Sequence, residues 1–401
     1  MRRYVRRHDL SDDDRTRLDF VISVFGPAMK EVSLSASRFR ARYSEETGVR
    51  LRGGVKPMTA DDANYDDISL VEDADKLPGV IGGVGFGEFV GRWFVGRHVR
   101  SGVFAPAGGL AISDARATCP LFEGVELSDP TGSYRTYGGS GFTMLVDERR
   151  LDGVPEPRTW EDILDPAYRG KVACGFNIDD INEIPLVYIY RRFGADGLAA
   201  FADNLARPVD TLDMMRVWLR GGAGRSVAVY LVPHFFAVAA PHESYVHEVW
   251  PDDGALLSPF YALVRGSYGR TSPAGGVDGA RGPSDGREGP AERIAREFFF
   301  GRDLAHTLAG RRMFHVGQTT QDLLEGSFGP TFAELDTTSP SELRKALRWT
   351  ESRRFCWVGW DWLLSCDIID TMGRIDSVVV PRVLEKNPGL AADIGRALWN
   401  G

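Results

Sequence analysis

One polar segment carries the residue types of a nucleophilic site, namely Cys174, Asn177, Asp179 and Asp180. A thiol becomes a nucleophile when a nearby base removes its proton, and either aspartate could act as that base. No motif of a base-paired nucleophile surrounds Cys174, and a packed thiol fits the same position. We therefore predict no catalytic residue and keep a Cys174-dependent enzyme as an alternative.

Three histidines, His234, His242 and His247, could bind a metal ion through their ring nitrogens. Their spacings of eight and five residues do not place them on one face of a helix. The 4 cysteines form no CxxC pair and no Cys/His cluster with zinc-ligand spacing. We expect neither a metal site nor a cofactor.

Residues 82–87 read GGVGFG, which only partly matches the dinucleotide-binding pattern G-x-G-x-x-G. We expect these glycines to form a sharp turn after a strand and to present backbone amides that suit an anionic or polar ligand. Ser140 stands in GGSG, which is not the nucleophile elbow of hydrolases. The aromatic run 355–362 is expected to pack in a core or between lobes, with a ligand cage as the alternative.

The elements around these residues alternate between strands and helices. Residues 20–25 are an apolar run ended by Gly26 and Pro27, residues 28–47 have helical spacing, and residues 49–55 read as a second strand. Further strands are expected at 80–81, 141–147, 171–174, 226–232 and 255–264. Further helices are expected at 181–193, 291–308, 341–349 and 388–399. This order is typical of an open α/β sheet.

The composition of the chain excludes several classes of protein and partner. A chain of 401 residues with 43% hydrophobic residues can form two lobes, each with its own core. The net charge of -8 argues against nucleic acid or an anionic membrane as the main partner. No apolar segment reaches the ~20 residues of a membrane span. Residues 1–14 contain no apolar stretch of a secretory signal, so we expect the chain as given to be cytoplasmic.

Several motifs along the chain make the sequence resemble a known family. Residues 157–166 (PRTWEDILDP) with 168–173 (YRGKVA) resemble a stretch of type II periplasmic solute-binding proteins of ABC transporters, most of all the group of ferric-iron-transport binding proteins. Residues 249–255 (VWPDDGA) and 77–81 (LPGVI) resemble further motifs of that family. The resemblance covers about residues 18–330.

The resemblance implies an α/β fold of two Rossmann-like lobes joined by crossover strands, with a C-terminal helical extension. Lobe 1 would comprise residues 18–137 and about 245–265, and lobe 2 residues 138–244. The remaining parts would be a flexible arm (1–17), a disordered Gly/Pro-rich insertion (266–290), helices returning to the lobes (291–330) and the extension (331–401).

The resemblance also implies that loops at the carboxyl ends of strands bind the ligand. The residues expected there are Gly26, Pro27, Gly83, Val84, Gly85, Gly139, Ser140, Asn177, Asp179, Asp180, His234 and Phe235. Members that hold bare ferric ion have two adjacent tyrosines where this chain has Phe235 and Phe236. Phenylalanine has no oxygen for a hard cation, so bare ferric ion is not the expected cargo.

The expected function is capture of a small molecule or ion by hinge closure, for import through an ABC permease, by a protein that performs no chemistry. A monomer is expected. The family norm is a periplasmic or extracytoplasmic location, in contrast to the N-terminal sequence. A cytoplasmic ligand sensor that docks a partner through its tail is the other alternative.

Overall fold

The computed structural model describes residues 18–57, 68–104, 118–177, 180–181, 183–206, 227–239, 245–266, 268, 288–328 and 339–387. The chain forms two compact units. Unit 1 comprises residues 1–139, 259–329 and 360–365, and unit 2 comprises residues 140–258, 330–359 and 366–401. None of the helices in the described ranges is both long and apolar enough to span a membrane.

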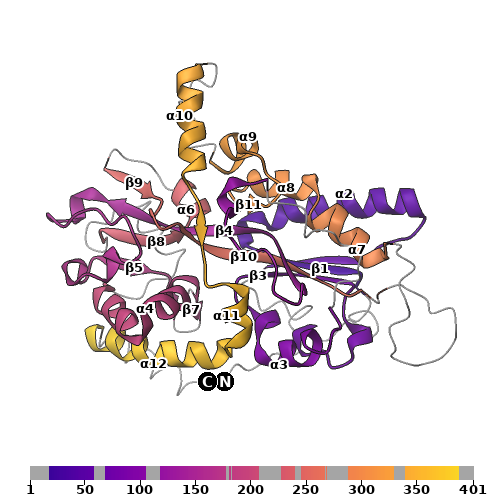
Figure 1. Cartoon of the computed structure of the whole chain (residues 1–401), viewed down its shortest axis with the longest axis horizontal. Coiled ribbons are helices and arrows are strands. Elements are labelled where there is room, and N and C mark those ends of the chain that lie inside the picture. Colours follow the sequence, from indigo (N-terminus) through magenta and orange to yellow (C-terminus); the bar gives the residue numbers. More distant parts are fainter. Residues whose placement is uncertain are drawn as a thin grey trace. The chain divides into compact units, whose positions relative to one another are not determined.

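Unit 1 contains a mixed sheet that begins with the predicted β–α–β unit (Figure 1). Strand β1 (Phe20–Val24) lies between two parallel neighbours, β2 (Gly53–Pro57) and β3 (Val80–Val84). The end of β10 (Ala255–Val264) pairs antiparallel with β3. The short strand β11 (Phe314–His315) pairs antiparallel with the start of β4 (Tyr134–Asp147).

Helices cover both faces of this sheet, with α2 (Met29–Thr47) and α8 (Arg302–Ala309) on one face and α3 (Arg92–Phe94) on the other (Figure 1). Among the described residues, the other α-helices of unit 1 are α7 (Pro290–Ile294), α9 (Thr320–Asp322) and α11 (Trp360–Ser365). Helix α2 ends at Gly48, as predicted, because its left-handed backbone (φ 72°) suits glycine. In the core, the rings of Phe20 and Phe298 lie 5.2 Å apart.

Unit 2 is built on the second part of β4, which pairs antiparallel with β8 (Val229–Pro233) and with β9 (Val246–Val249). Strand β5 (Val172–Cys174) is parallel to β8. The start of β10 pairs with β12 (Phe355–Cys356), and β6 (Phe176–Asn177) pairs with β7 (Asp180–Ile181). Strands β4 and β10 therefore each run from one unit into the other. Residues 246–258, which the sequence suggested for lobe 1, belong to unit 2.

Two motifs of the family resemblance, residues 157–166 and residues 249–255, contact each other in unit 2. Trp160 is fully buried, and its indole nitrogen donates to the carbonyl oxygen of Gly254 at 2.8 Å. Its backbone nitrogen donates to the carboxylate of Asp253 at 3.3 Å. The tryptophan thus anchors its segment next to the start of β10.

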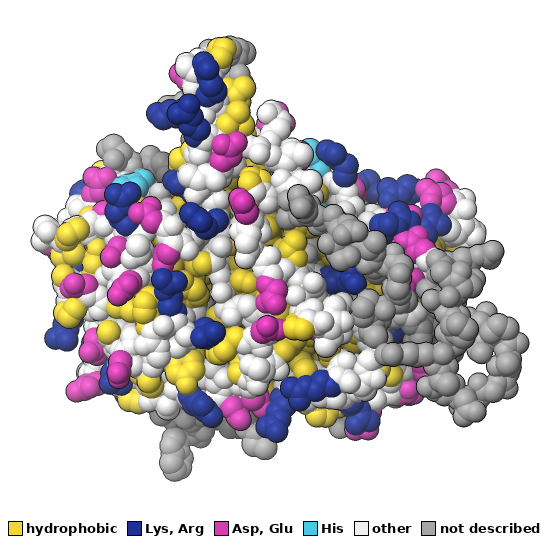
Figure 2. All heavy atoms as spheres, viewed as in Figure 1, with side chains coloured by type: hydrophobic (Ala, Val, Ile, Leu, Met, Phe, Trp, Pro, Cys, Tyr) yellow, Lys and Arg dark blue, Asp and Glu magenta, His cyan; other side chains and the backbone are white. Residues whose placement is uncertain are grey.

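Most of the C-terminal segment belongs to unit 2, and residues 360–365 belong to unit 1. Helix α12 (Ile368–Lys386) lies along α4 (Glu183–Asn204), as Figure 1 shows. Lys386 donates to three carbonyl oxygens at the end of α4, those of Ala202, Asp203 and Leu205. Unit 2 also contains α6 (His234–Ala239) and α10 (Pro340–Glu351). In Figure 2, α10 carries basic side chains on one side and hydrophobic ones on the other.

Several expected elements differ in the structure. Gly82, Gly83 and Val84 lie inside β3, and the turn begins only at Gly85, whose φ is 63°. Gly139 and Ser140 lie inside β4 and not in a loop. The second strand begins at Gly53 and not at residue 49, and α12 was not predicted. The arm 1–17, the helix at 388–399 and nearly all of the insertion 266–290 lie outside the described residues.

Candidate functional site

In unit 1, Gly26 and Pro27 occupy the predicted position at the carboxyl end of β1 and are exposed. They form a single 3-10 turn (Gly26–Ala28) that leads into α2. Proline suits this position because its fixed φ fits the first turn of a helix and its missing N–H leaves no unpaired donor there. No side chain caps the N-terminus of α2. This edge therefore presents the positive end of a long helix dipole.

Gly83 serves packing in unit 1. A Cβ atom at this position would lie 2.3 Å from the ring of Tyr261. The glycine therefore lets the tyrosine ring lie flat against β3. Gly85 makes the turn after β3, and its N–H donates to the carbonyl oxygen of Pro259 at 2.9 Å. Gly83 and Val84 were expected in a loop after the strand but lie in β3 itself, and their role as ligand-binding residues stays a prediction.

In unit 2, the structure builds a polar centre around His234, which is fully buried at the start of α6. Its Nδ1 lies 2.8 Å from Oε1 of Glu248 on β9. The hydroxyl of Thr143 on β4 donates to the same oxygen at 2.6 Å. The ring of Trp250 meets the imidazole edge-on, with ring centres 5.7 Å apart. Residues from β4, from β9 and from the position after β9 thus surround one imidazole.

The carboxylate of Glu248 determines the chemistry of this centre. A carboxylate next to Nδ1 favours a proton on that nitrogen, which then donates to Oε1 of Glu248. Burial lowers the pKa of the nearby Arg353, and the negative charge of Glu248 opposes that shift. The sequence predicted His234 but missed Glu248 and Thr143. Their only sequence signal was a polar residue at alternating positions of an apolar strand.

The other predicted ligand-binding residues of unit 2 are Phe235, Ser140, Asn177, Asp179 and Asp180. Phe235 is buried, and its ring centre lies 4.6 Å from that of Phe236. Ser140 is fully buried, and its hydroxyl has no hydrogen-bond partner in the described part of the chain. The backbones of Asn177 and Asp180 pair in the β6–β7 hairpin. Their side chains, and the whole of Asp179, lie outside the described residues.

Cys174 lies at the end of β5 and is buried. Burial raises the pKa of its thiol to about 12, because a thiolate loses its hydration there. At neutral pH the sulfur is therefore protonated and a poor nucleophile. This environment is typical of a packed cysteine.

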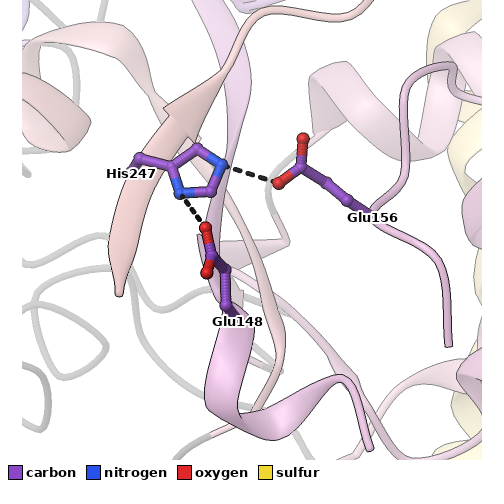
Figure 3. Close-up of side chains that lie close together, drawn as sticks. All are labelled: Glu148, Glu156 and His247. Atoms are coloured by element: carbon purple, nitrogen blue, oxygen red, sulfur yellow. Dashed lines mark hydrogen bonds and ion pairs between the residues drawn. The ribbon is translucent and has the colours of Figure 1, made fainter. Parts of the chain in front are cut away.

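A second polar group of unit 2 involves His247 (Figure 3). Neighbouring residues of a strand point to opposite faces, so His247 faces away from the polar centre that Glu248 joins. Its Nδ1 lies 3.3 Å from Glu148, and its Nε2 lies 2.6 Å from Glu156. Within the described ranges this is the one group of three side chains with metal-ligand types close together. Each ring nitrogen faces its own carboxylate. His242, the third histidine of the sequence-based hypothesis, lies outside the described residues.

A groove of about 500 Å³ opens on unit 1 between α2, α8 and the residues after α9. Its charged side chains are Glu31, Arg38, Arg311, Arg312, Asp322 and Glu325. Most of its cations are matched inside unit 1, since Arg311 pairs with Glu31 and Arg38 pairs with Asp303. The groove therefore has no charge preference of its own.

Known structures share this architecture. The apo ferric ion-binding protein A of Pasteurella haemolytica superposes with a TM-score of 0.52 at 12% identity, over 89% of this chain and 98% of that chain. A Trichodesmium protein (IdiA, FutA) solved with iron and citrate gives 0.49 at 13% identity, over 86% and 100%. The spermidine/putrescine substrate-binding protein PotD of Streptococcus pneumoniae gives 0.49 at 11% identity, over 92% and 100%. The first of these likenesses confirms the fold expected from the sequence, that of type II periplasmic binding proteins.

The family follows from the sequence itself. A family model described as bacterial extracellular solute-binding protein matches residues 75–275, half of the 401 residues. The chain therefore belongs to the bacterial extracellular solute-binding protein family. No curated protein sequence matches it.

Proposed function

We propose that this protein captures a small solute by a hinge movement of its two units and delivers it to an ABC permease. Membership of the solute-binding family supports this function. The observation that carries the hinge is that β4 and β10 each pass from one unit into the other. Strands that cross between units can bend without breaking either core. The proposal includes a monomer, and no nucleic acid or membrane surface as partner.

We propose His234 and Ser140 as ligand-binding residues of unit 2. Glu248 holds the imidazole in one orientation, which suits recognition of a polar solute. The buried hydroxyl of Ser140 lacks a protein partner among the described residues, and such a group is stabilised by a ligand or water that bonds to it. Phe235 and Phe236 offer no oxygen, which argues against bare ferric ion as the cargo. Gly26 and Pro27 remain the proposed contribution of unit 1, and Gly85, Gly139, Asn177, Asp179 and Asp180 remain candidates.

We propose binding without chemistry. The buried, protonated thiol of Cys174 argues against the Cys174-dependent enzyme. The packing of α12 on α4 argues against the sensor that docks through a separable tail. Turnover of the bound solute by the purified protein would contradict this part of the proposal.

The first experiment identifies the solute. The purified protein is denatured, the released small molecules are identified by mass spectrometry, and each is returned to ligand-free protein in a thermal-shift assay. A true ligand at 100 times its Kd should add about 2.7 kcal/mol to the free energy of unfolding. If no released or screened solute shifts the transition, the solute-binding function is contradicted.

The second experiment tests Ser140 with a matched control. Ser140→Ala removes a buried hydroxyl that has no described partner, so stability should be unchanged or slightly higher. Its affinity for the solute should fall about tenfold, which corresponds to about 1.4 kcal/mol. Ser258→Ala removes a second such hydroxyl of unit 2 and should leave affinity unchanged. Equal affinities of both variants and the parent protein would remove Ser140 from the site.

A further inference from the structure

The described C-terminal segment passes through both units. Residues 339–359 belong to unit 2, residues 360–365 belong to unit 1, and residues 366–387 return to unit 2. This path adds two crossings between the units to those of β4 and β10. Each of its three parts is anchored within its own unit, as the contacts below show.

The first anchor is β12 in unit 2. Phe355 and Cys356 pair with Ala255 and Leu256 at the start of β10. The indole nitrogen of Trp250 donates to the carbonyl oxygen of Arg354 at 3.1 Å. Hydrogen bonds of backbone and side chain thus hold the segment up to Cys356.

The second anchor is Trp360 in unit 1, which is fully buried. Its ring stacks on Tyr134 with centres 4.8 Å apart and meets Tyr261 edge-on at 5.4 Å. Its backbone nitrogen donates to Glu126 at 2.8 Å, and its indole nitrogen lies 3.3 Å from the hydroxyl of Thr136. A buried tryptophan with both nitrogens hydrogen-bonded is a strong attachment, because it removes about 150–250 Å² of side chain from water.

The third anchor is α12 in unit 2. Asp367 caps the helix by accepting from the backbone nitrogen of Ile369 at 3.1 Å. The helix then packs along α4, and Lys386 fastens its far end to three carbonyl oxygens of that region. The connections between anchors are short. Trp357, Val358 and Gly359 link the first anchor to the second, and Cys366 links the second to the third.

We propose that residues 355–386 form a strap that limits how far the two units can move apart. From Cys356 to Trp360 the chain has four peptide steps, which can span at most about 14 Å. From Ser365 to Asp367 it has two steps, which can span at most about 7 Å. A larger displacement must pull Trp360 out of unit 1 or separate β12 from β10. The strap therefore restricts the hinge movement on which the proposed function rests.

The test lengthens the strap without disturbing its anchors. A Gly-Ser-Gly-Ser segment is inserted between Val358 and Gly359 and again between Cys366 and Asp367. The control has the same insertions at the exposed turn after Gly153, within unit 2. Spin labels on an unnatural amino acid at Lys30 in α2 and Ala195 in α4, both exposed, report the distance between the units by pulsed EPR without solute.

The lengthened strap should broaden the distance distribution toward longer values, by up to about 10 Å for flexible linkers of this length. The control insertion should leave the distribution of the parent protein unchanged. Trp360→Ala should broaden it in the same direction when circular dichroism shows that the variant is folded. Identical distributions for the lengthened, control and parent proteins would overturn the strap.

This test separates the strap from the proposed function, because it needs no solute. Broadening in a protein that binds no solute supports the strap and contradicts the function. An unchanged distribution in a protein that binds its solute supports the function and overturns the strap.

Discussion

Helix α12 offers a sharp test of the C-terminal segment, because it carries the same residue type in two environments. Its buried positions are Ile368, Thr371, Ile375, Val379 and Val383. They recur every three or four residues, so they form one stripe. Ile375 is 0% exposed, whereas Ile369 on the same helix is 69% exposed. Replacing each isoleucine with alanine removes the same atoms in both cases, so the difference measures packing.

Ile375→Ala removes three buried carbons, about 2.4 kcal/mol at about 0.8 kcal/mol each, before the energy of the remaining cavity is added. We expect the free energy of unfolding to fall by about 2–5 kcal/mol. For a unit of this size, each kcal/mol corresponds to about 2–4 °C in Tm. Ile369→Ala should change stability by no more than about 0.5 kcal/mol.

Urea unfolding followed by circular dichroism measures both variants against the parent protein. A lower midpoint with an unchanged slope shows a loss of stability without a change in the surface exposed on unfolding. If Ile375→Ala is as stable as Ile369→Ala, α12 does not pack on unit 2 in solution. The extension would then be available as the partner-docking tail of the sensor alternative.

Three further predictions concern buried groups. Burial lowers the pKa of His315 from 6.5 to about 4, so the folded state stays neutral where the unfolded chain binds a proton. The free energy of unfolding should therefore fall by about 1.4 kcal/mol per pH unit as the pH drops through that window, and His315→Gln should flatten this slope in urea titrations. Gly83→Ala should lower Tm by several degrees, because its Cβ would lie 2.3 Å from the ring of Tyr261. Cys174 should react with a thiol reagent only after denaturation, as mass spectrometry of the labelled peptide would show.

The sequence predicted those elements whose signals are local. Residues 20–48 combine an apolar run, a proline at a helix start and a glycine at a helix end, and the structure has β1, α2 and a left-handed Gly48 there. Each of these signals acts over a few residues, so no knowledge of distant contacts is needed.

The sequence was misinterpreted at glycines whose presence is explained by contacts with residues distant in the chain. Gly82 and Gly83 suggested a turn, but they continue β3 because Phe299 and Tyr261 occupy the space of a side chain. Gly138 is similar, since its Cβ would lie 2.4 Å from the carbonyl oxygen of Phe314. A glycine that permits a turn and a glycine that admits a distant ring look alike in a single sequence. The same ambiguity hid the continuation of β4 through Gly139 and Ser140.

The polar centre of unit 2 was predictable only in part, for a similar reason. His234 follows an apolar strand, and that position alone marked it as a candidate. Glu248 and Thr143 reach it through strand pairing, because β4 lies between β8 and β9. The pairing sets Leu145 opposite Tyr230 on one side and Glu248 on the other. The register of these strands is set by the packing of the whole sheet. The partners of His234 could therefore not be predicted from the spacing of residues in the sequence.

The C-terminal segment is joined to the motif that carries the family resemblance. The carbonyl oxygen of Gly254 accepts from the indole of Trp160 at 2.8 Å and lies 3.2 Å from the thiol of Cys356. A Cβ at Gly254 would lie 2.9 Å from the backbone nitrogen of Cys356, so only glycine lets β12 approach this closely. Its φ of 105° favours glycine independently. One residue thus supports both the family core and the start of the strap. Gly254→Ala should therefore disturb the anchor of Trp160 and the β12 pairing together.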